Sequence, residues 1–233
     1  MTEPTPLTDD LGPMFRRIES HLQLLPSLTP EEEAERNRTI AEQRWQSYAQ
    51  LDNIPRRLWA ASLQSGMRTA AIIRATEYVT GSEYKKGGCL ILAGPTGAGK
   101  SYAAVGAMRH LETGHFRYWP AMCGALLTPG TRPDELHALK ASSLLVLDDV
   151  GAEYLKVDGL VEAFFDEMIW HREGNMLPTI MTTNLTTEAL KSRWSARIVD
   201  RIRGGWGSVA ECIGESMRKP FCPPSLLSTS PHR

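Results

Sequence analysis

The chain has 233 residues, of which 42% are hydrophobic, and its 26 basic and 27 acidic residues give a formal net charge of −1. That length suits one α/β domain with an additional segment, and the near-neutral charge excludes binding to nucleic acid through overall charge, so any DNA contact must be local. No signal peptide, membrane-length apolar run or C-x-x-C pair is present, which predicts a cytoplasmic protein without membrane contact or a zinc site.

The chain begins with a region that predicts helices and no sheet. In residues 1–28 the apolar residues recur with no sustained helical or strand periodicity. Thr29 and Pro30 then suit the cap and the first position of a helix, and Glu32 closes a capping box. This helix is expected to run to about Leu51. Two shorter helices are expected at 57–67 and 69–79.

Residues 1–80 allow two interpretations. They form either a solvated helical arm that packs lightly on the core or an arm that docks a partner protein. The second interpretation rests on large side chains that stand on a thin, polar scaffold, the kind that anchors interfaces: Trp45, Tyr48, Leu58 and Trp59.

From Cys89 onward, apolar runs alternate with helical patterns, which predicts an α/β fold class with a parallel sheet covered on both faces. The clearest helix is expected at 157–173, with Gly174 as its stop. The strands are expected at 89–93, 116–120, 143–148, 178–183 and 208–212.

A phosphate-binding loop follows the first strand. Residues 94–101 read GPTGAGKS and match the pattern G-x-x-x-x-G-K-[ST] in full. Lys100 is expected to reach the β- and γ-phosphates of ATP, and the Ser101 hydroxyl is expected to bind Mg²⁺. The residues assigned to nucleotide binding are Gly94, Pro95, Thr96, Gly97, Ala98, Gly99, Lys100, Ser101 and Tyr102.

Polar residues end two later strands, where the phosphate-binding loop also opens. Asp148 is assigned to the metal and Asp149 to the attacking water, with Glu153 as the next candidate for the water. Asn184 is assigned to sensing the γ-phosphate or the water. The alternatives are an acidic turn after a strand and an ordinary turn asparagine.

The segment ARIVDRIRGG, residues 196–205, predicts a short helix with Arg197 and Arg201 on one face. Two like charges at that spacing favour a nearby anion, so Arg201 is a candidate arginine finger. A solvated face relieved by Asp200 is the alternative. Further along the chain, Arg218 is a candidate for a contact with the phosphates in cis.

The DNA-binding residues are less well defined. Residues 116–119 combine aromatic and cationic side chains, which suits single-stranded DNA, but they also read as a core strand. A helical element is expected at 121–142. Further candidates are Arg132, Lys140 and Tyr154.

The ordered set GPTGAGKS, LLVLDDVGAE, TIMTTNL, ARIVDRIRGG and GESMRKP resembles the DnaC/DnaI-type helicase loaders and the related IstB-type transposition ATPases, within the AAA+ class. The resemblance covers about residues 55–221, including IPRRLWAASL. It implies strand order 5-1-4-3-2, ATP hydrolysis, assembly on single-stranded DNA and docking of the arm on a replicative helicase. It also places Arg201 at the arginine-finger position and Arg218 at the second-sensor position.

These features predict a helical partner-docking region at 1–80, an ATP-binding domain at 81–222 and a flexible tail at 223–233. We expect no C-terminal helical lid, and therefore an oligomer in which Arg201 acts in trans. The first hypothesis is a helicase loader, and the alternative in the same fold is a transposition helper that recruits a transposase. A small-molecule kinase needs an arginine-rich lid, which residues 113–131 do not provide.

Overall fold

The computed structural model describes residues 28–126, 133–153, 159–214, 216 and 217. The chain divides into two compact units, residues 1–44 and 45–233. Helix α2 (Pro30–Leu51) begins at the predicted capping box: the Thr29 and Glu32 backbone amides donate to each other's side chains, at 2.8 and 3.2 Å. Among the residues described, no helix has the length and apolar character needed to cross a membrane.

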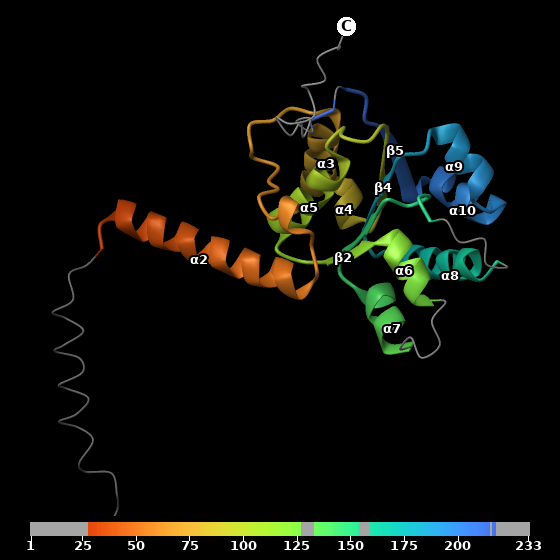
Figure 1. The fold of residues 1–233 in the computed structure, drawn as a ribbon, viewed down its shortest axis with the longest axis horizontal. Coiled ribbons are helices and arrows are strands. Elements are labelled where there is room, and N and C mark those ends of the chain that lie inside the picture. Colours follow the sequence, from red (N-terminus) through yellow and green to blue (C-terminus); the bar gives the residue numbers. More distant parts are fainter. Residues whose placement is uncertain (1–27, 127–132, 154–158, 215, 218–233) are drawn as a thin grey trace, which may run out of the picture. The chain divides into compact units, whose positions relative to one another are not determined.

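The second unit is built on a five-stranded parallel sheet in the order β2-β3-β4-β1-β5, which confirms the predicted order (Figure 1). Every residue of β1, β3 and β4 is buried, as expected for strands covered on both faces. The strands are β1 (Cys89–Ala93), β2 (His115–Tyr118), β3 (Leu145–Asp148), β4 (Thr179–Thr183) and β5 (Gly207–Glu211).

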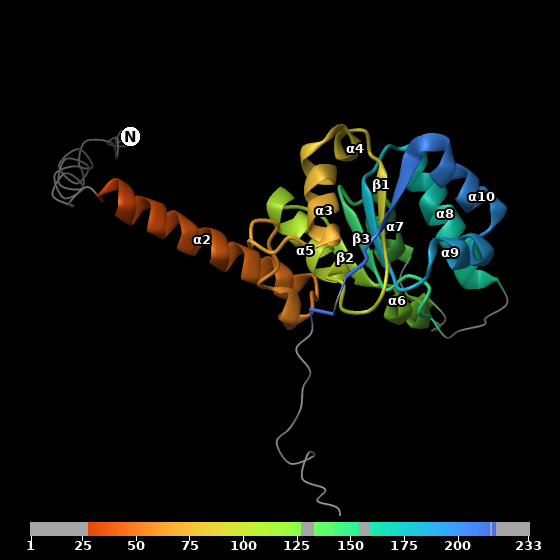
Figure 2. The ribbon, with the colours of Figure 1, turned by 90° about the horizontal axis from the view of Figure 1, so that it is seen from above.

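Helices cover both faces of this sheet (Figure 2). Helices α3 (Ala70–Thr80) and α5 (Lys100–Leu111) pack on one face, and α8 (Leu160–Gly174) and α10 (Ala196–Arg201) pack on the other. Alternating residues of β1 supply the two cores, with Leu90 and Leu92 on the α5 side and Ile91 on the α8 side. Shorter elements are α4 (Ser82–Lys85), α9 (Thr187–Arg193) and the π-helical turn η2 (Ile202–Trp206).

The prediction of a helix at 57–67 is wrong. Only a 3₁₀ turn, η1 (Arg56–Leu58), forms, and turns and irregular backbone follow as far as Thr69, which caps α3. Tertiary contacts override helical propensity here. The Tyr102 hydroxyl donates to the Ala60 carbonyl at 2.9 Å, and Gly106 of α5, which has no side chain, lets the backbone at Leu63 approach closely.

The large side chains expected to anchor a partner pack instead within this chain. Trp45 is 7% and Leu58 6% exposed, both in the core of the second unit. Trp45 Nε1 donates to the Trp59 carbonyl at 2.6 Å, and the Tyr48 hydroxyl donates to the carbonyl of Gly114. Residues 45–80 therefore contribute to the core beside the sheet, and these side chains are not free anchors in this conformation.

Strand β2 stops at Tyr118, two residues earlier than expected. Trp119 begins α6 (Trp119–Leu126) and is 1% exposed, with its ring stacked on Phe164 of α8 at 6.5 Å between centroids. Helix α7 (Pro133–Ala141) follows, so the helical element expected at 121–142 is two helices. The predicted tail, 223–233, lies outside the described residues.

Candidate functional site

The phosphate-binding loop lies between β1 and the first turn of α5, as predicted. Gly94 has φ +152°, and a Cβ there would collide with the Cys212 carbonyl. Gly97 has φ +93° and packs directly against Ser216, while Gly99 caps α5 in the left-handed region at φ +82°. The loop therefore needs glycine for both conformation and space, and its backbone ends at a helix N-terminus, where N–H groups can hold a phosphate chain.

Lys100 is buried at 5% exposure, and its ammonium group is held by oxygen atoms of the loop. Nζ donates to the carbonyls of Gly94 at 2.7 Å and Pro95 at 2.8 Å, and to Oδ1 of Asn184 at 2.9 Å. A buried ammonium group needs such acceptors. Nucleotide phosphates would supply stronger, charged acceptors at the same place.

Asp148 ends β3 and is 2% exposed. The Thr182 hydroxyl donates to its Oδ1 at 2.6 Å, and the Ser101 hydroxyl also bonds to its carboxylate. Burial raises the pKa of Asp148 and the charge of Asp149 adds to this, while the hydrogen bonds from Ser101 and Thr182 oppose the rise.

The side chains of Ser101 and Asp148 fit a site for Mg²⁺. The described residues contain no group of three or more His, Cys, Asp or Glu side chains that could hold a metal alone. Magnesium is commonly held by one or two carboxylates, waters and nucleotide phosphates. Ser101 and Asp148, joined by a hydrogen bond at the loop, are therefore a suitable protein contribution.

Asp149 and Asn184 meet across the edge of the sheet. Asn184 Nδ2 donates to Asp149 Oδ1 at 2.8 Å. Asp149 adopts a left-handed backbone conformation, with φ +62°, and its amide donates to the Thr182 hydroxyl at 3.0 Å. The carboxylate of Asp149 therefore lies beside the asparagine that also contacts Lys100.

Glu153, the other candidate for contacting the attacking water, is held by other residues of the chain. Its side chain is 8% exposed, its carboxylate pairs with Arg193, and it accepts a hydrogen bond of 2.8 Å from the amide of Gly151. Asp149 is therefore better placed than Glu153 to face a bound nucleotide.

A cavity of about 470 Å³ opens over the loop. It brings together six of the nine residues assigned to nucleotide binding, but not Gly94, Pro95 or Ala98, and it adds others that the sequence reasoning missed. Its lining includes Thr96, Gly97, Gly99, Lys100, Ser101, Tyr102, Asp148, Asp149 and Asn184, together with Arg57, Leu58, Met67 and Met217. The last four come from segments far away in sequence. Arg57, Leu58 and Met217 lie in IPRRLWAASL and GESMRKP, two segments of the family resemblance, but none of the four was assigned to the nucleotide site.

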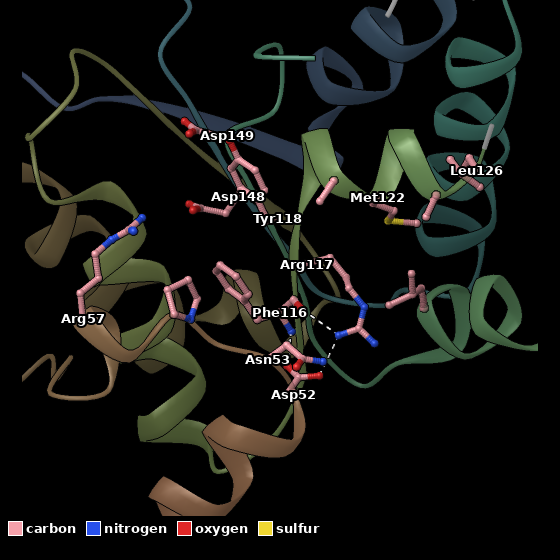
Figure 3. Close-up of a pocket in the computed structure, with 14 residues that line it drawn as sticks. Asp52, Asn53, Arg57, Phe116, Arg117, Tyr118, Met122, Leu126, Asp148 and Asp149 are labelled. Atoms are coloured by element: carbon pink, nitrogen blue, oxygen red, sulfur yellow. Dashed lines mark hydrogen bonds and ion pairs between the residues drawn. The ribbon is translucent and has the colours of Figure 1, made fainter. Parts of the chain in front are cut away.

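A second cavity, of about 560 Å³, adjoins the first and shares Arg57, Asp148 and Asp149 with it (Figure 3). Its other walls come from the segment after α2, from β2 and from α6. They include apolar side chains such as Phe116 and Met122 and the ion pair between Arg117 and Asp52, at 2.8 Å.

Arg201 does not line either of these cavities. It is partly buried on α10, and its guanidinium pairs with Glu173 of α8 rather than with Asp200. One of its nitrogen atoms, Nε, is buried without a hydrogen-bond partner among the described residues. Arg197 is exposed on the same helix. Arg218 lies outside the described residues.

The structure narrows the residues that could contact DNA. Phe116 and Trp119 are buried and cannot stack on bases in this conformation, whereas Tyr118 is 46% exposed. Lys140 is paired with Glu167 at 2.5 Å. The other two candidates, Arg132 and Tyr154, lie outside the described residues.

Comparisons with solved structures find the same fold in proteins of DNA replication. A DnaI structure matches with a TM-score of 0.58 and 26% identity, covering 71% of this chain and 94% of that one. A DnaC helicase loader matches with a TM-score of 0.59 and 23% identity, covering 68% and 100%. The replication initiator DnaA, bound to AMPPCP and single-stranded DNA, matches with a TM-score of 0.56 and 19% identity, covering 66% and 50%.

No family model and no curated protein sequence matches this chain. The structural matches confirm the resemblance to DnaI and DnaC and the AAA+ fold that it implied.

Proposed function

We propose that this chain, whose core has the AAA+ fold of DnaI and DnaC, is an ATPase that loads a replicative DNA helicase onto single-stranded DNA. The observation that carries the proposal is the convergence of Lys100, Asp148, Asp149 and Asn184 at one edge of the parallel sheet. Ligands of open α/β sheets bind at this edge. The match to the solved DnaC helicase loader chain, at 68% coverage of this chain, is consistent with this role.

In the proposed site, each side chain has a separate task. The backbone amides at the start of α5 hold the phosphate chain, and Lys100 leaves its loop carbonyls to contact the β- and γ-phosphates. Ser101 and Asp148 would hold Mg²⁺, which when bound neutralises charge on the phosphate oxygens. Asp149 accepts a proton from the attacking water, and Asn184 orients both that carboxylate and the γ-phosphate.

The remaining wall of the site is proposed to come from a second copy of the chain. Arg201 is held against Glu173 within its own subunit and does not line its own phosphate-binding loop cavity. An arginine presented on a packed helix suits a neighbour's ATP, where it would stabilise charge on the transferring phosphoryl group. We therefore propose an oligomer that assembles along single-stranded DNA.

The proposed partner contact lies in the N-terminal arm. Within the described part of unit 1, α2 is charged and exposed, and its first turn carries Glu31, Glu32 and Glu33. Because residues 45–80 belong to the core of the second unit, the deletion that tests this role should end at Arg44. Removing 1–44 should abolish helicase capture and preserve nucleotide binding.

A loading assay tests the function. The full-length chain, the replicative helicase of the same organism and circular single-stranded DNA are mixed with ATP, and DNA-bound helicase is isolated by gel filtration. We expect loading that depends on ATP and is lost in Lys100→Ala. Absence of helicase loading, with ATP-dependent binding to duplex DNA and to a transposase, would instead support the transposition helper.

A further inference from the structure

Arg57 places a positive charge at the nucleotide cavity, but none of the roles proposed for ATP binding or hydrolysis involves it. It lies on η1, lines both cavities and shares each of them with Asp148 and Asp149. Its side chain extends from η1 toward these carboxylates (Figure 3). Its charge acts on the buried carboxylate, because it is one of the groups that oppose the rise in the pKa of Asp148.

The guanidinium is exposed, and among the described residues no hydrogen bond or ion pair holds it. The partly buried arginines Arg74, Arg117 and Arg201 differ in this respect, because each pairs with a carboxylate. With respect to the described residues, Arg57 therefore keeps its donors available, and a planar fork of donors matches phosphate oxygens in particular.

The backbone that carries Arg57 is fixed on both sides. Before it, Asp52 is 7% exposed and accepts hydrogen bonds from the Phe116 amide, from Arg117 at 2.8 Å and from the His115 ring at 2.9 Å, which ties the segment to β2. After it, the Trp59 carbonyl accepts a hydrogen bond of 2.6 Å from Nε1 of Trp45, which ties the segment to α2. The side chain is thus presented to the cavity by a rigid base.

The place where Arg57 points is also where the terminal phosphate would lie. Lys100, Asp149 and Asn184 are linked by hydrogen bonds around the mouth of the loop, and all three line the same cavity as Arg57. The loop amides at the start of α5 would hold the β-phosphate. A guanidinium beside Asp148 and Asp149 would therefore contact the γ-phosphate of ATP, which ADP lacks, and not the β-phosphate, which both nucleotides have.

We propose that Arg57 is a phosphate-sensing residue that binds the terminal phosphate of ATP held on the loop of the same chain and so distinguishes ATP from ADP. When ATP is bound, this contact fastens the segment 52–59 to the nucleotide. When ADP is bound, the contact is absent and the segment is held by its own anchors alone. The inference rests on the proposed ATP binding, and it adds a second arginine, acting in cis, to the trans arginine of that proposal.

Titration calorimetry of the full chain with Mg²⁺ and either ADP or a non-hydrolysable ATP analogue tests it. Loss of a charge-assisted hydrogen bond to phosphate typically weakens binding about tenfold to a hundredfold. We expect Arg57→Ala to lose that much affinity for the ATP analogue while its affinity for ADP stays within about twofold of wild type. Because Arg57 is exposed, the melting temperature of the free variant should not change.

The neighbouring arginine provides a matched control. Arg56 lies over the Trp59 ring at 5.5 Å and lines neither of these cavities. Arg56→Ala removes the same charge one residue away, and we expect it to bind both nucleotides like wild type. Equal losses in the two variants would overturn the proposal, because they would reflect net charge and not a contact.

Hydrogen exchange gives a readout that is independent of affinity. Backbone amides of 52–59 should exchange more slowly with the ATP analogue than with ADP in wild type, and this difference should vanish in Arg57→Ala. If Arg57→Ala retains the wild-type preference for the ATP analogue, or loses affinity for both nucleotides equally, Arg57 does not sense the terminal phosphate. A wild-type chain that binds neither nucleotide would instead refute the proposed ATPase, a result distinct from either of these.

Discussion

Asn184 donates its side-chain amide to the carboxylate of Asp149 at 2.8 Å, although the two residues directly follow different strands, β4 and β3, and lie 35 positions apart. The oxygen of the same amide accepts a hydrogen bond of 2.9 Å from Lys100. One asparagine therefore links the cation of the phosphate-binding loop to the acid proposed to activate water. A nucleotide that draws Lys100 onto its phosphates would release that oxygen and leave the amide to orient Asp149.

This relationship predicts that Asp149→Asn separates binding from turnover. The variant should bind Mg²⁺ and ATP like wild type but hydrolyse ATP about 10²–10⁴ times more slowly, which is the typical contribution of a general base. Steady-state phosphate release and calorimetry measure the two quantities. Glu153→Gln is the matched control, because Glu153 is held by Arg193 and Gly151 and should be dispensable for the chemistry. Normal turnover in Asp149→Asn with loss in Glu153→Gln would reverse the assignment.

The buried carboxyl of Asp148 makes a prediction about stability and pH. Burial raises its pKa in the folded state, so the folded chain holds this proton to a higher pH than the unfolded chain does. Wild-type stability should therefore fall as pH rises from the ordinary carboxyl range through the raised pKa. Asp148→Asn has no carboxyl to ionise and does not lose stability in this way. The difference in unfolding free energy between Asp148→Asn and wild type should therefore grow in favour of the variant across that pH window and then stay constant. Urea unfolding at a series of pH values, without nucleotide, measures it. An advantage that does not change with pH would contradict this explanation.

Arg172 has a structural role that no sequence pattern predicted. It is fully buried on α8, and it donates to Thr179 Oγ1 and to the carbonyls of Leu139, Lys140, Ser142 and Pro178 at distances of 2.6 to 3.0 Å. Burial lowers its pKa to about 10, so the guanidinium stays charged at neutral pH. It therefore joins the segments that lead into β3 and β4.

Replacing Arg172 by Leu should leave several of these carbonyls without a donor. Each buried polar group left in that state costs about 1–3 kcal/mol, so we expect a loss of roughly 3 kcal/mol or more and a fall in melting temperature of about 6–12 °C. Lys191→Ala, an exposed change on α9, should leave the melting temperature unchanged. A melting temperature within about 2 °C of wild type for Arg172→Leu would show that water or local rearrangement replaces the network.

The proposed oligomer predicts complementation between two inactive variants. Arg201→Ala should bind ATP normally and hydrolyse it about 10³–10⁵ times more slowly, while Lys100→Ala should fail to bind it. Mixed assemblies should regain part of the activity, because an intact loop in one subunit meets an intact arginine from its neighbour. Phosphate release from the mixture, with co-assembly verified by light scattering, measures this. Co-assembly without recovery would leave Arg201 a structural role in its pair with Glu173.

Much of this site was predictable from sequence because its parts lie at strand ends. The meeting of the loop with Asp148, Asp149 and Asn184 follows from apolar runs that end in polar residues, whereas the strand order was implied by the family resemblance and not by these runs. The segment 52–69 was not predictable, because its shape depends on anchors from elsewhere, such as Tyr102 on Ala60 and Asp52 on β2. Arg57 and Met217 lie in segments that carry the family resemblance, but nothing in those segments, or around Met67, indicated that these side chains would line the cavity.

Packing also decided which aromatic side chains remain at the surface. Trp45 and Trp119 look like anchors for a partner or for DNA when each is read within its own segment. Both fill the core: Trp45 stacks on Tyr48, and Trp119 stacks on Phe164. A pattern within one segment cannot reveal that another element will cover it.

The most direct test of the account is calorimetric titration of the purified full chain and of Lys100→Ala with ATP and Mg²⁺. The Lys100 ammonium group is buried at the mouth of the loop, and its loss removes the charge that meets the β- and γ-phosphates. The account predicts saturable binding of one ATP per chain in wild type and at least about tenfold weaker binding in the variant. Equal affinities, or no binding by wild type, would contradict the assignment of this sheet edge as an ATP site.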